Sequence, residues 1–168
     1  KLNIKGAFMN KKTIAFLTRS IIDATGNNMW KGLESECRKE NIPLITFRGP
    51  VLNKGHGSIL YYLINDSSYS GIISWASSDV DQGTIDFYKR YTETPLVCMT
   101  FRVQGHPLII TDCRTGIMEL MDHLIKVHNF TKIAFIRGPE NHVYAKDRYE
   151  GYLESLSNHG IPLDEEII

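Results

Sequence analysis

The sequence predicts an α/β fold built on a doubly wound parallel sheet. From residue 13 onward, short runs rich in β-branched residues alternate with segments whose apolar residues recur at helical spacing. The runs are nearly continuously apolar, as in strands that are covered on both faces. Regular strand–helix alternation of this kind indicates parallel strands joined by helical crossovers.

Each element is justified by its own pattern. The expected strands span residues 13–18, 43–47, 71–75, 96–99, 108–110 and 132–136. The expected helices span residues 27–40, 55–65, 78–91, 114–128 and 142–159. Their ends carry residues that favour caps and stops: Asn41 and Pro43, the capping-box spacing of 78–81, Asn129, and Gly160. We find no internal repeat and no low-complexity segment.

The composition is that of a globular protein. Among 168 residues, 42% are hydrophobic, and 19 Lys+Arg balance 19 Asp+Glu. This excludes disorder and gives no sign of the basic face that binds a nucleic-acid duplex. No apolar run is long enough to span a membrane, and no signal peptide is evident. Because Cys37, Cys98 and Cys113 form no CxxC pair, we expect free thiols in a cytoplasmic protein.

The sequence lacks the motifs that several kinds of cofactor binding and catalysis require. The loop after the first strand, residues 18–26, has neither a dinucleotide-binding nor a P-loop glycine pattern. There is no G-x-S-x-G nucleophile elbow. His123 and His128 are five residues apart on one expected helix, a spacing that does not put them on one face, so we expect no metal site. The sequence therefore predicts neither a cofactor nor a catalytic residue.

Arginines follow the ends of four expected strands, where ligands bind in doubly wound sheets: Arg19, Arg48, Arg102 and Arg137. A guanidinium recognises carboxylates, phosphates or vicinal hydroxyls. The alternative is that these arginines are solvated loop charges. Trp75 and Phe101 lie at the same edge. They could stack on a sugar or base ring, or simply belong to the core.

Five short motifs occur in a fixed order in the second half of the chain. They are ITDCRTG (110–116), MDHL (121–124), FTKIAFIRGP (130–139), DRYEGY (147–152) and HGIPLD (159–164). In this order they resemble the effector-binding domain of the lactose/galactose-repressor family, whose fold is that of type I periplasmic binding proteins. Residues before 110 agree with the family in layout only.

The resemblance implies two lobes joined by a hinge, with a ligand in the cleft. Residues 1–12 would be an N-terminal extension and 13–110 the first lobe. Residues 111–168 would hold the hinge crossing, at Thr111-Asp112, and the start of a second lobe that is incomplete in this chain. Arg148 matches the arginine of the family's R-x-x-G motif, which bonds effector hydroxyls. Thr100 stands where many members have Asp or Asn, a departure that questions an ordinary hexose as the ligand.

From spacing alone, Arg148 could instead be an exposed arginine paired with Asp147, Glu150 or Glu154. We therefore expect a ligand site drawn from the resemblance and from the strand ends. Its candidate residues are Arg148, Arg19, Trp75, Thr100, Phe101, Arg102, Asp112 and Arg137.

These observations lead to an expected function and its alternatives. We expect a non-catalytic sensing domain for a sugar-like, polar or anionic effector, forming a homodimer and coupling cleft closure to an output domain. Only twelve residues precede the first strand and Met9 looks like a natural start, which favours the input module of a sensor histidine kinase or diguanylate cyclase. The alternatives are the ligand-binding domain of a DNA-binding repressor, a doubly wound enzyme, and an interaction domain without a ligand.

Overall fold

A computed structural model describes residues 12–49, 59–65, 68–75, 82–100, 102–140 and 142–168. The chain divides into two compact units, Lys1–Ile109 and Ile110–Ile168. Among the described helices, none has the length and apolar character needed to cross a membrane.

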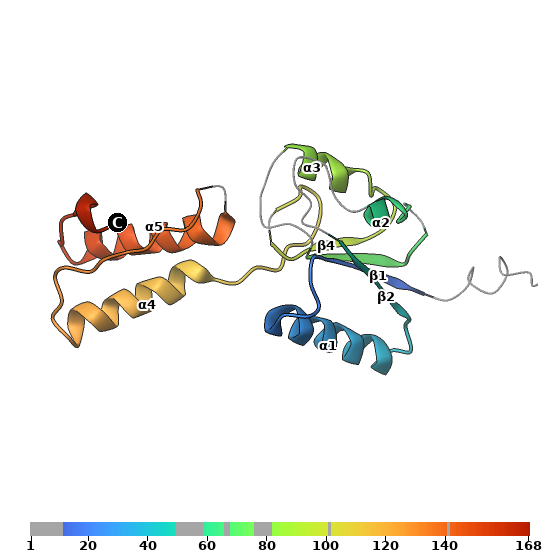
Figure 1. Ribbon diagram of the computed structural model, residues 1–168, viewed down its shortest axis with the longest axis horizontal. Coiled ribbons are helices and arrows are strands. Elements are labelled where there is room, and N and C mark those ends of the chain that lie inside the picture. The colour runs from blue at the N-terminus through green and yellow to red at the C-terminus, as the bar shows by residue number, and fades with distance from the viewer. Residues whose placement is uncertain (1–11, 50–58, 66–67, 76–81, 101, 141) are drawn as a thin grey trace, which may run out of the picture. The chain divides into compact units, whose positions relative to one another are not determined.

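The first unit is built on a four-stranded parallel sheet (Figure 1). Its strands are β1 (Ile14–Thr18), β2 (Leu44–Arg48), β3 (Gly71–Trp75) and β4 (Leu96–Cys98), in the order β2-β1-β3-β4. Every pairing is parallel, and β1 lies between β2 and β3. The predicted doubly wound parallel α/β fold is therefore confirmed.

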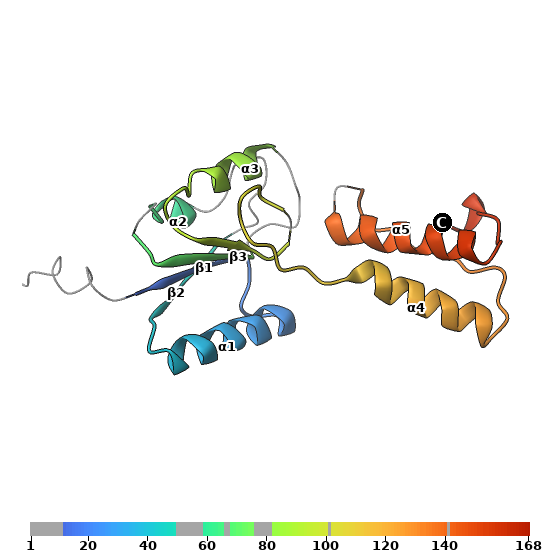
Figure 2. The ribbon, with the colours of Figure 1, turned by 180° about the vertical axis from the view of Figure 1, so that it is seen from behind.

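Helices cover both faces of this sheet. Figures 1 and 2 show α1 (Ala24–Lys39) on one face and α2 (Ile59–Tyr62) with α3 (Gln82–Lys89) on the other. Helix α1 begins three residues before the sequence pattern suggested, because Asp23 caps it by accepting a hydrogen bond from the Gly26 amide at 2.8 Å. The expected helices at 55–65 and 78–91 lie partly, and the capping box at 78–81 wholly, outside the described residues.

The core of the first unit consists of apolar strand residues and buried tyrosines. Phe16, Leu17 and Ile72 are almost fully inaccessible, as are Tyr61 and Tyr88 from the helices above them. The Tyr61 hydroxyl donates to the Thr18 carbonyl at 3.0 Å, and burial raises the pKa of Tyr61 to about 12. The hydroxyl thus stays protonated and ties α2 to the end of β1.

The second unit is a pair of packed helices with an extended segment beside them. Helix α4 (Cys113–Lys126) packs along α5 (Val143–Asn158), and a 3-10 turn, Glu165–Ile167, follows. Met121, Tyr152 and Leu156 form its buried centre, against which Ile133 and Phe135 of the extended segment pack. The Tyr152 hydroxyl donates to the Ile133 carbonyl at 2.9 Å.

Two of the predicted strands, 108–110 and 132–136, do not pair with a neighbouring strand along their length. In 108–110, Leu108 makes an isolated parallel bridge to Cys98. Residues 132–136 are extended but belong to no strand, because the described part of the second unit offers no strand to pair with them. At the edge of this segment, the Phe135 amide donates a hydrogen bond to the Ile167 carbonyl at 3.0 Å.

The predicted helix stops are confirmed by the backbone. Asn41 and Asn129 take left-handed conformations, with φ of 53° and 56°, and Gly160 has φ of 65°. Asparagine and glycine tolerate this conformation better than other residues do, so these positions end helices sharply.

Candidate functional site

The carboxyl edge of the first sheet brings together two of the predicted site residues. Trp75 ends β3 and is paired in register with Thr18, so Arg19 follows directly beside it. The Arg19 guanidinium carbon lies 5.8 Å from the Trp75 ring centroid, within the range of a cation–π contact. Arg19 is exposed and Trp75 half-buried, so the pair presents a cation and an aromatic face to solvent.

The loop below this pair is tightly built. The Thr18 hydroxyl donates to the Ser20 carbonyl at 2.9 Å. A Cβ on Gly26 would lie 2.3 Å from that carbonyl oxygen and 3.2 Å from the Trp75 ring, so only glycine fits there. The Ser20 hydroxyl and the Gly26 amide hold the pKa of Asp23 below its usual value. The ionised Asp23 therefore fixes the start of α1 beneath Trp75.

The other predicted residues of the first unit are less closely gathered. Thr100 is buried, with 5% of its surface exposed, so it is a hydrogen-bonding group of the interior. Arg48 and Arg102 are exposed, and no hydrogen bond or ion pair joins Arg102 to another described residue. Phe101 lies outside the described residues.

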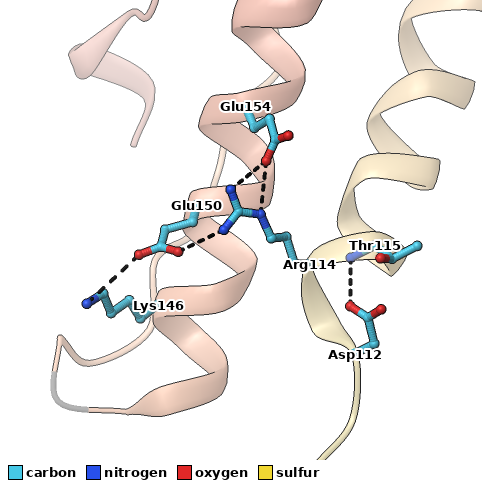
Figure 3. A network of polar contacts seen from close by, with 6 residues as sticks. All are labelled: Asp112, Arg114, Thr115, Lys146, Glu150 and Glu154. Carbon is cyan, nitrogen blue, oxygen red and sulfur yellow. Dashed lines mark hydrogen bonds and ion pairs between the residues drawn. The ribbon is translucent and has the colours of Figure 1, made fainter.

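In the second unit, Asp112 has a structural task. Its carboxylate accepts a hydrogen bond from the Thr115 amide at 3.0 Å and caps α4 (Figure 3). That backbone bond is the main reason why the pKa of Asp112 lies below its usual value. The residue is exposed, and the Thr115 side chain also lowers this pKa by hydrogen bonding to the carboxylate.

Arg137 follows the extended segment and lies over an aromatic ring. Its guanidinium carbon is 4.1 Å from the Tyr149 centroid, and Glu140 is at the limit of an ion pair, 4.0 Å away. These side chains line a pocket of about 410 Å³ together with others of the 138–140 turn and of α5, among them Lys146 and Leu153. The pocket combines an aromatic wall with charged groups at its rim, as small-molecule sites do.

Arg148 is half-buried on α5. Two carboxylates that could have neutralised it, Glu150 and Glu154, are instead bound by Arg114 of α4 (Figure 3). Arg114 donates from Nη1 to Glu150 at 3.1 Å and from Nε to Glu154 at 2.9 Å. No hydrogen bond or ion pair joins the Arg148 guanidinium to any other residue that the structure describes.

The space beside Arg148 is kept open by a glycine. A Cβ on Gly138 would lie 2.7 Å from the Ala145 Cβ and 4.0 Å from the Arg148 Nη2. The guanidinium thus reaches the turn that follows the extended segment 132–136. This is the end of the segment at which the sequence predicted ligand contacts.

Sequence reasoning missed two residues that organise this region. Arg114 was read only as part of a motif, although it holds both glutamates. Gly151 was read as the end of R-x-x-G, whereas a Cβ there would lie 2.9 Å from the Arg114 carbonyl oxygen. The spacing of Glu150 and Glu154, one helical turn apart, was the signal that a cation bridges them.

A parallel α/β sheet with cationic and aromatic side chains at its carboxyl edge has the layout in which doubly wound folds hold ligands. Comparisons with known proteins agree. No protein-family model matches the chain. A curated relative, the probable HTH-type transcriptional repressor ExuR of Bacillus subtilis (strain 168), is 30% identical over 108 residues, which are 63% of this chain and 32% of the relative.

Solved structures share the fold over nearly the whole chain. The transcription regulator CcpA of Lactococcus lactis has a TM-score of 0.73 at 18% identity, covering 94% of this chain. A LacI family transcriptional regulator from Mycobacterium smegmatis has a TM-score of 0.70 at 25% identity over 90%. The CelR–cellobiose complex has a TM-score of 0.69 at 18% identity over 94%.

The chain spans 57%, 53% and 50% of these three solved chains, respectively. It therefore corresponds to about half of each, in keeping with the predicted incomplete second lobe. The resemblance to the effector-binding domain of the lactose/galactose-repressor family, first noted in five sequence motifs, is confirmed at the level of the fold.

Proposed function

We propose that this chain is part of the effector-binding region of a transcription regulator and that it binds a small polar molecule through Arg148. The observation that carries the proposal is the pairing of Glu150 and Glu154 with Arg114. A half-buried guanidinium that pairs with no carboxylate among the described residues favours an external anion or a set of hydroxyls, because charge-assisted hydrogen bonds stabilise it.

The chemistry of the other candidates points to a sugar-like or anionic effector. Arg19 beside Trp75, and Arg137 over Tyr149, each combine a cation with an aromatic face, which suits a ring bearing hydroxyls or an acid group. Arg102, Phe101, Thr100 and Asp112 complete the proposed set. In keeping with this class, CelR was solved with cellobiose.

We assign residues 13–110 to a first lobe and residues 111–168 to the hinge crossing and the start of a second. Support for this division comes from the two compact units, which meet at Ile109 and Ile110, and from the length of the solved relatives. In the complete protein, effector binding would select one arrangement of the lobes and so bias the output domain.

For the output domain, a DNA-binding module is the better-supported choice. The curated relative is described as an HTH-type repressor, and the solved neighbours are described as transcription regulators. A histidine kinase or cyclase output remains the alternative, and the domain itself would be non-catalytic in either case. The full gene sequence around this chain distinguishes the two.

A homodimer is proposed from the apolar surface of the second unit. Ile136 has 97% of its surface exposed, and Val127, Phe130 and Leu120 have half or more exposed. Apolar side chains in this number favour association. Light scattering of the 168-residue chain should therefore report a species larger than the monomer, and a monodisperse monomer would contradict the proposal.

The experiment that tests the proposed function is a thermal-shift screen. Neutral sugars, sugar acids and sugar phosphates are each added to the 168-residue chain and to its Arg148→Ala variant. A ligand of the native state raises the melting temperature in proportion to its binding. We expect a shift for at least one member that the variant loses. A screen without any shift, or with equal shifts in both proteins, would contradict the proposal.

A further inference from the structure

The C-terminal end of α4 brings two histidines together that the sequence spacing separates. His123 lies in the last turn of α4, and His128 lies beyond the helix end. Their Nε2 atoms are 3.1 Å apart. The prediction assumed one continuous helix, on which a five-residue spacing does not share a face; the side chains meet because the helix stops at Lys126 and the chain turns back over its last turn.

The turn that does this is fixed by the backbone. Asn129 takes a φ of 56°, and its amide donates to the Ile125 carbonyl at 3.0 Å, while the Phe130 amide donates to the Leu124 carbonyl at 3.2 Å. The Phe130 ring then stacks on His128, with centroids 5.5 Å apart and planes 17° apart. Both imidazoles are exposed, so their nitrogens are accessible from solvent.

The geometry points to a two-nitrogen chelate, and we propose that His123 and His128 bind one divalent transition-metal ion. Nitrogens 3.1 Å apart, each about 2.1 Å from a metal, subtend an angle of about 95° at it. Square or octahedral coordination places neighbouring ligands near 90°, whereas tetrahedral coordination would separate the nitrogens by about 3.4 Å. Ni²⁺ and Cu²⁺ therefore fit this pair better than Zn²⁺.

The ring positions support the same conclusion. If both lone pairs converge on one metal at about 2.1 Å, the ring centroids should be about 4.8 Å apart. The observed separation is 4.9 Å, with the planes at 76°. A straight N–H···N hydrogen bond along both ring axes would place the centroids at about 5.4 Å. The ring separation is thus compatible with a metal ion bound by both nitrogens, which in the metal-free chain make a hydrogen bond to each other.

The neighbouring Asp122 carboxylate is engaged elsewhere. The Asp122 carboxylate binds Lys126 at 2.5 Å and His159 at 3.2 Å. Among the described residues, no group of three metal-ligating side chains gathers anywhere, so water would fill the remaining positions. The pair also lies at the end of α4 opposite Asp112. Across the 14 residues of this helix, that is about 21 Å, so the proposed metal site is distant from Asp112.

Titration calorimetry with Ni²⁺ tests the proposal. The 168-residue chain is used near pH 8, where free imidazoles are neutral, in a buffer that does not bind metals. We expect one Ni²⁺ per chain, and a loss of at least tenfold in affinity for His123→Gln and for His128→Gln, since each leaves a single imidazole. His106→Gln, which removes a histidine from the other unit, should bind like the parent.

Because both histidines are exposed, these variants should keep the metal-free melting temperature of the parent. Cu²⁺ paramagnetic resonance gives a second readout, in which the parent shows two nitrogen ligands and each variant shows one. The proposal is overturned if either variant binds Ni²⁺ as tightly as the parent. It is also overturned if the parent binds no more tightly than the double variant.

Discussion

The Arg114 guanidinium of α4 donates from both Nε and Nη2 to one carboxylate oxygen of Glu154 on α5, at 2.9 and 2.5 Å. With its third contact, to Glu150, it links the two helices of the second unit (Figure 3). The Glu154 carboxylate is the main reason that the pKa of Arg114 lies above its usual value. Arg114 is thus engaged between the two helices, whereas Arg148 makes no hydrogen bond or ion pair with another described residue.

The close approach of the two helices predicts an unusual response at Gly151. Replacing a helical glycine with alanine normally favours the helix by up to about 1 kcal/mol. At Gly151 the added Cβ would meet the Arg114 carbonyl oxygen at 2.9 Å. We therefore expect Gly151→Ala to lower the free energy of unfolding by about 1–3 kcal/mol, as measured by urea denaturation.

Gly116 is the matched control for that variant. It lies in α4 with nothing within 4 Å of its added Cβ, so Gly116→Ala should leave stability unchanged or raise it. If both alanine variants are equally stable, the helices are not packed as closely as the structure indicates.

Tyr152→Phe should destabilise the second unit. The Tyr152 side chain is 1% exposed, and its hydroxyl donates to the Ile133 carbonyl at 2.9 Å. Losing this bond should cost about 1 kcal/mol. Tyr149→Phe, on the same helix, removes a hydroxyl that makes no hydrogen bond to another described residue, and it should cost less. Equal unfolding midpoints in urea for the two variants would refute this role of Tyr152.

The lowered pKa of Asp112 leads us to expect that the free energy of unfolding depends on pH. The Thr115 amide holds the pKa of Asp112 in the folded chain below 3.8, so the unfolded chain binds more protons as the solution is acidified. The stabilisation from the ionised cap is therefore present above the unfolded pKa and is lost as the pH falls through the folded one. Asp112→Asn still caps but cannot titrate, so we expect its unfolding midpoint to fall less than that of the parent between about pH 5 and pH 2.

The control for this series is Asp86→Asn, which changes an exposed carboxylate of α3 that pairs with Lys89. It should keep the pH dependence of the parent. Identical profiles for the parent and Asp112→Asn would show that the carboxylate of Asp112 does not stabilise α4.

Local patterns predicted much of the fold. Alternating apolar runs identified all four strands of the sheet, and the residues chosen as helix stops, Asn41, Asn129 and Gly160, have the left-handed backbone that such stops need. The strand at 132–136 was predicted from its own apolar run. A strand also needs a partner, however, and its partner is a property of the rest of the fold rather than of the segment.

The candidate site was less accessible to sequence reasoning because it depends on contacts between distant residues. That Arg19 lies by Trp75 follows from the pairing of β1 with β3, which no local pattern states. Arg148 was found by its motif, but only the structure shows that Glu150 and Glu154 bind Arg114, more than thirty positions away, and that Arg148 pairs with no other described residue. The His123–His128 pair was missed because uniform helical geometry was assumed past the end of α4.

The central claim is that Arg148 binds the effector, and calorimetric titration of the best ligand from the thermal-shift screen tests it most directly. The parent is compared with Arg148→Ala, Arg148→Lys and a control, Arg38→Ala, which removes an exposed arginine paired with Glu34 on α1. Charge-assisted hydrogen bonds contribute roughly 1.5–3 kcal/mol each, so Arg148→Ala should raise Kd by about tenfold to a hundredfold for each bond lost. Arg148→Lys should bind nearly as weakly, because an ammonium cannot reproduce the planar fork, while Arg38→Ala should bind like the parent. If Arg148→Ala keeps both the parent's Kd and its melting temperature, Arg148 is a surface charge and the account is wrong.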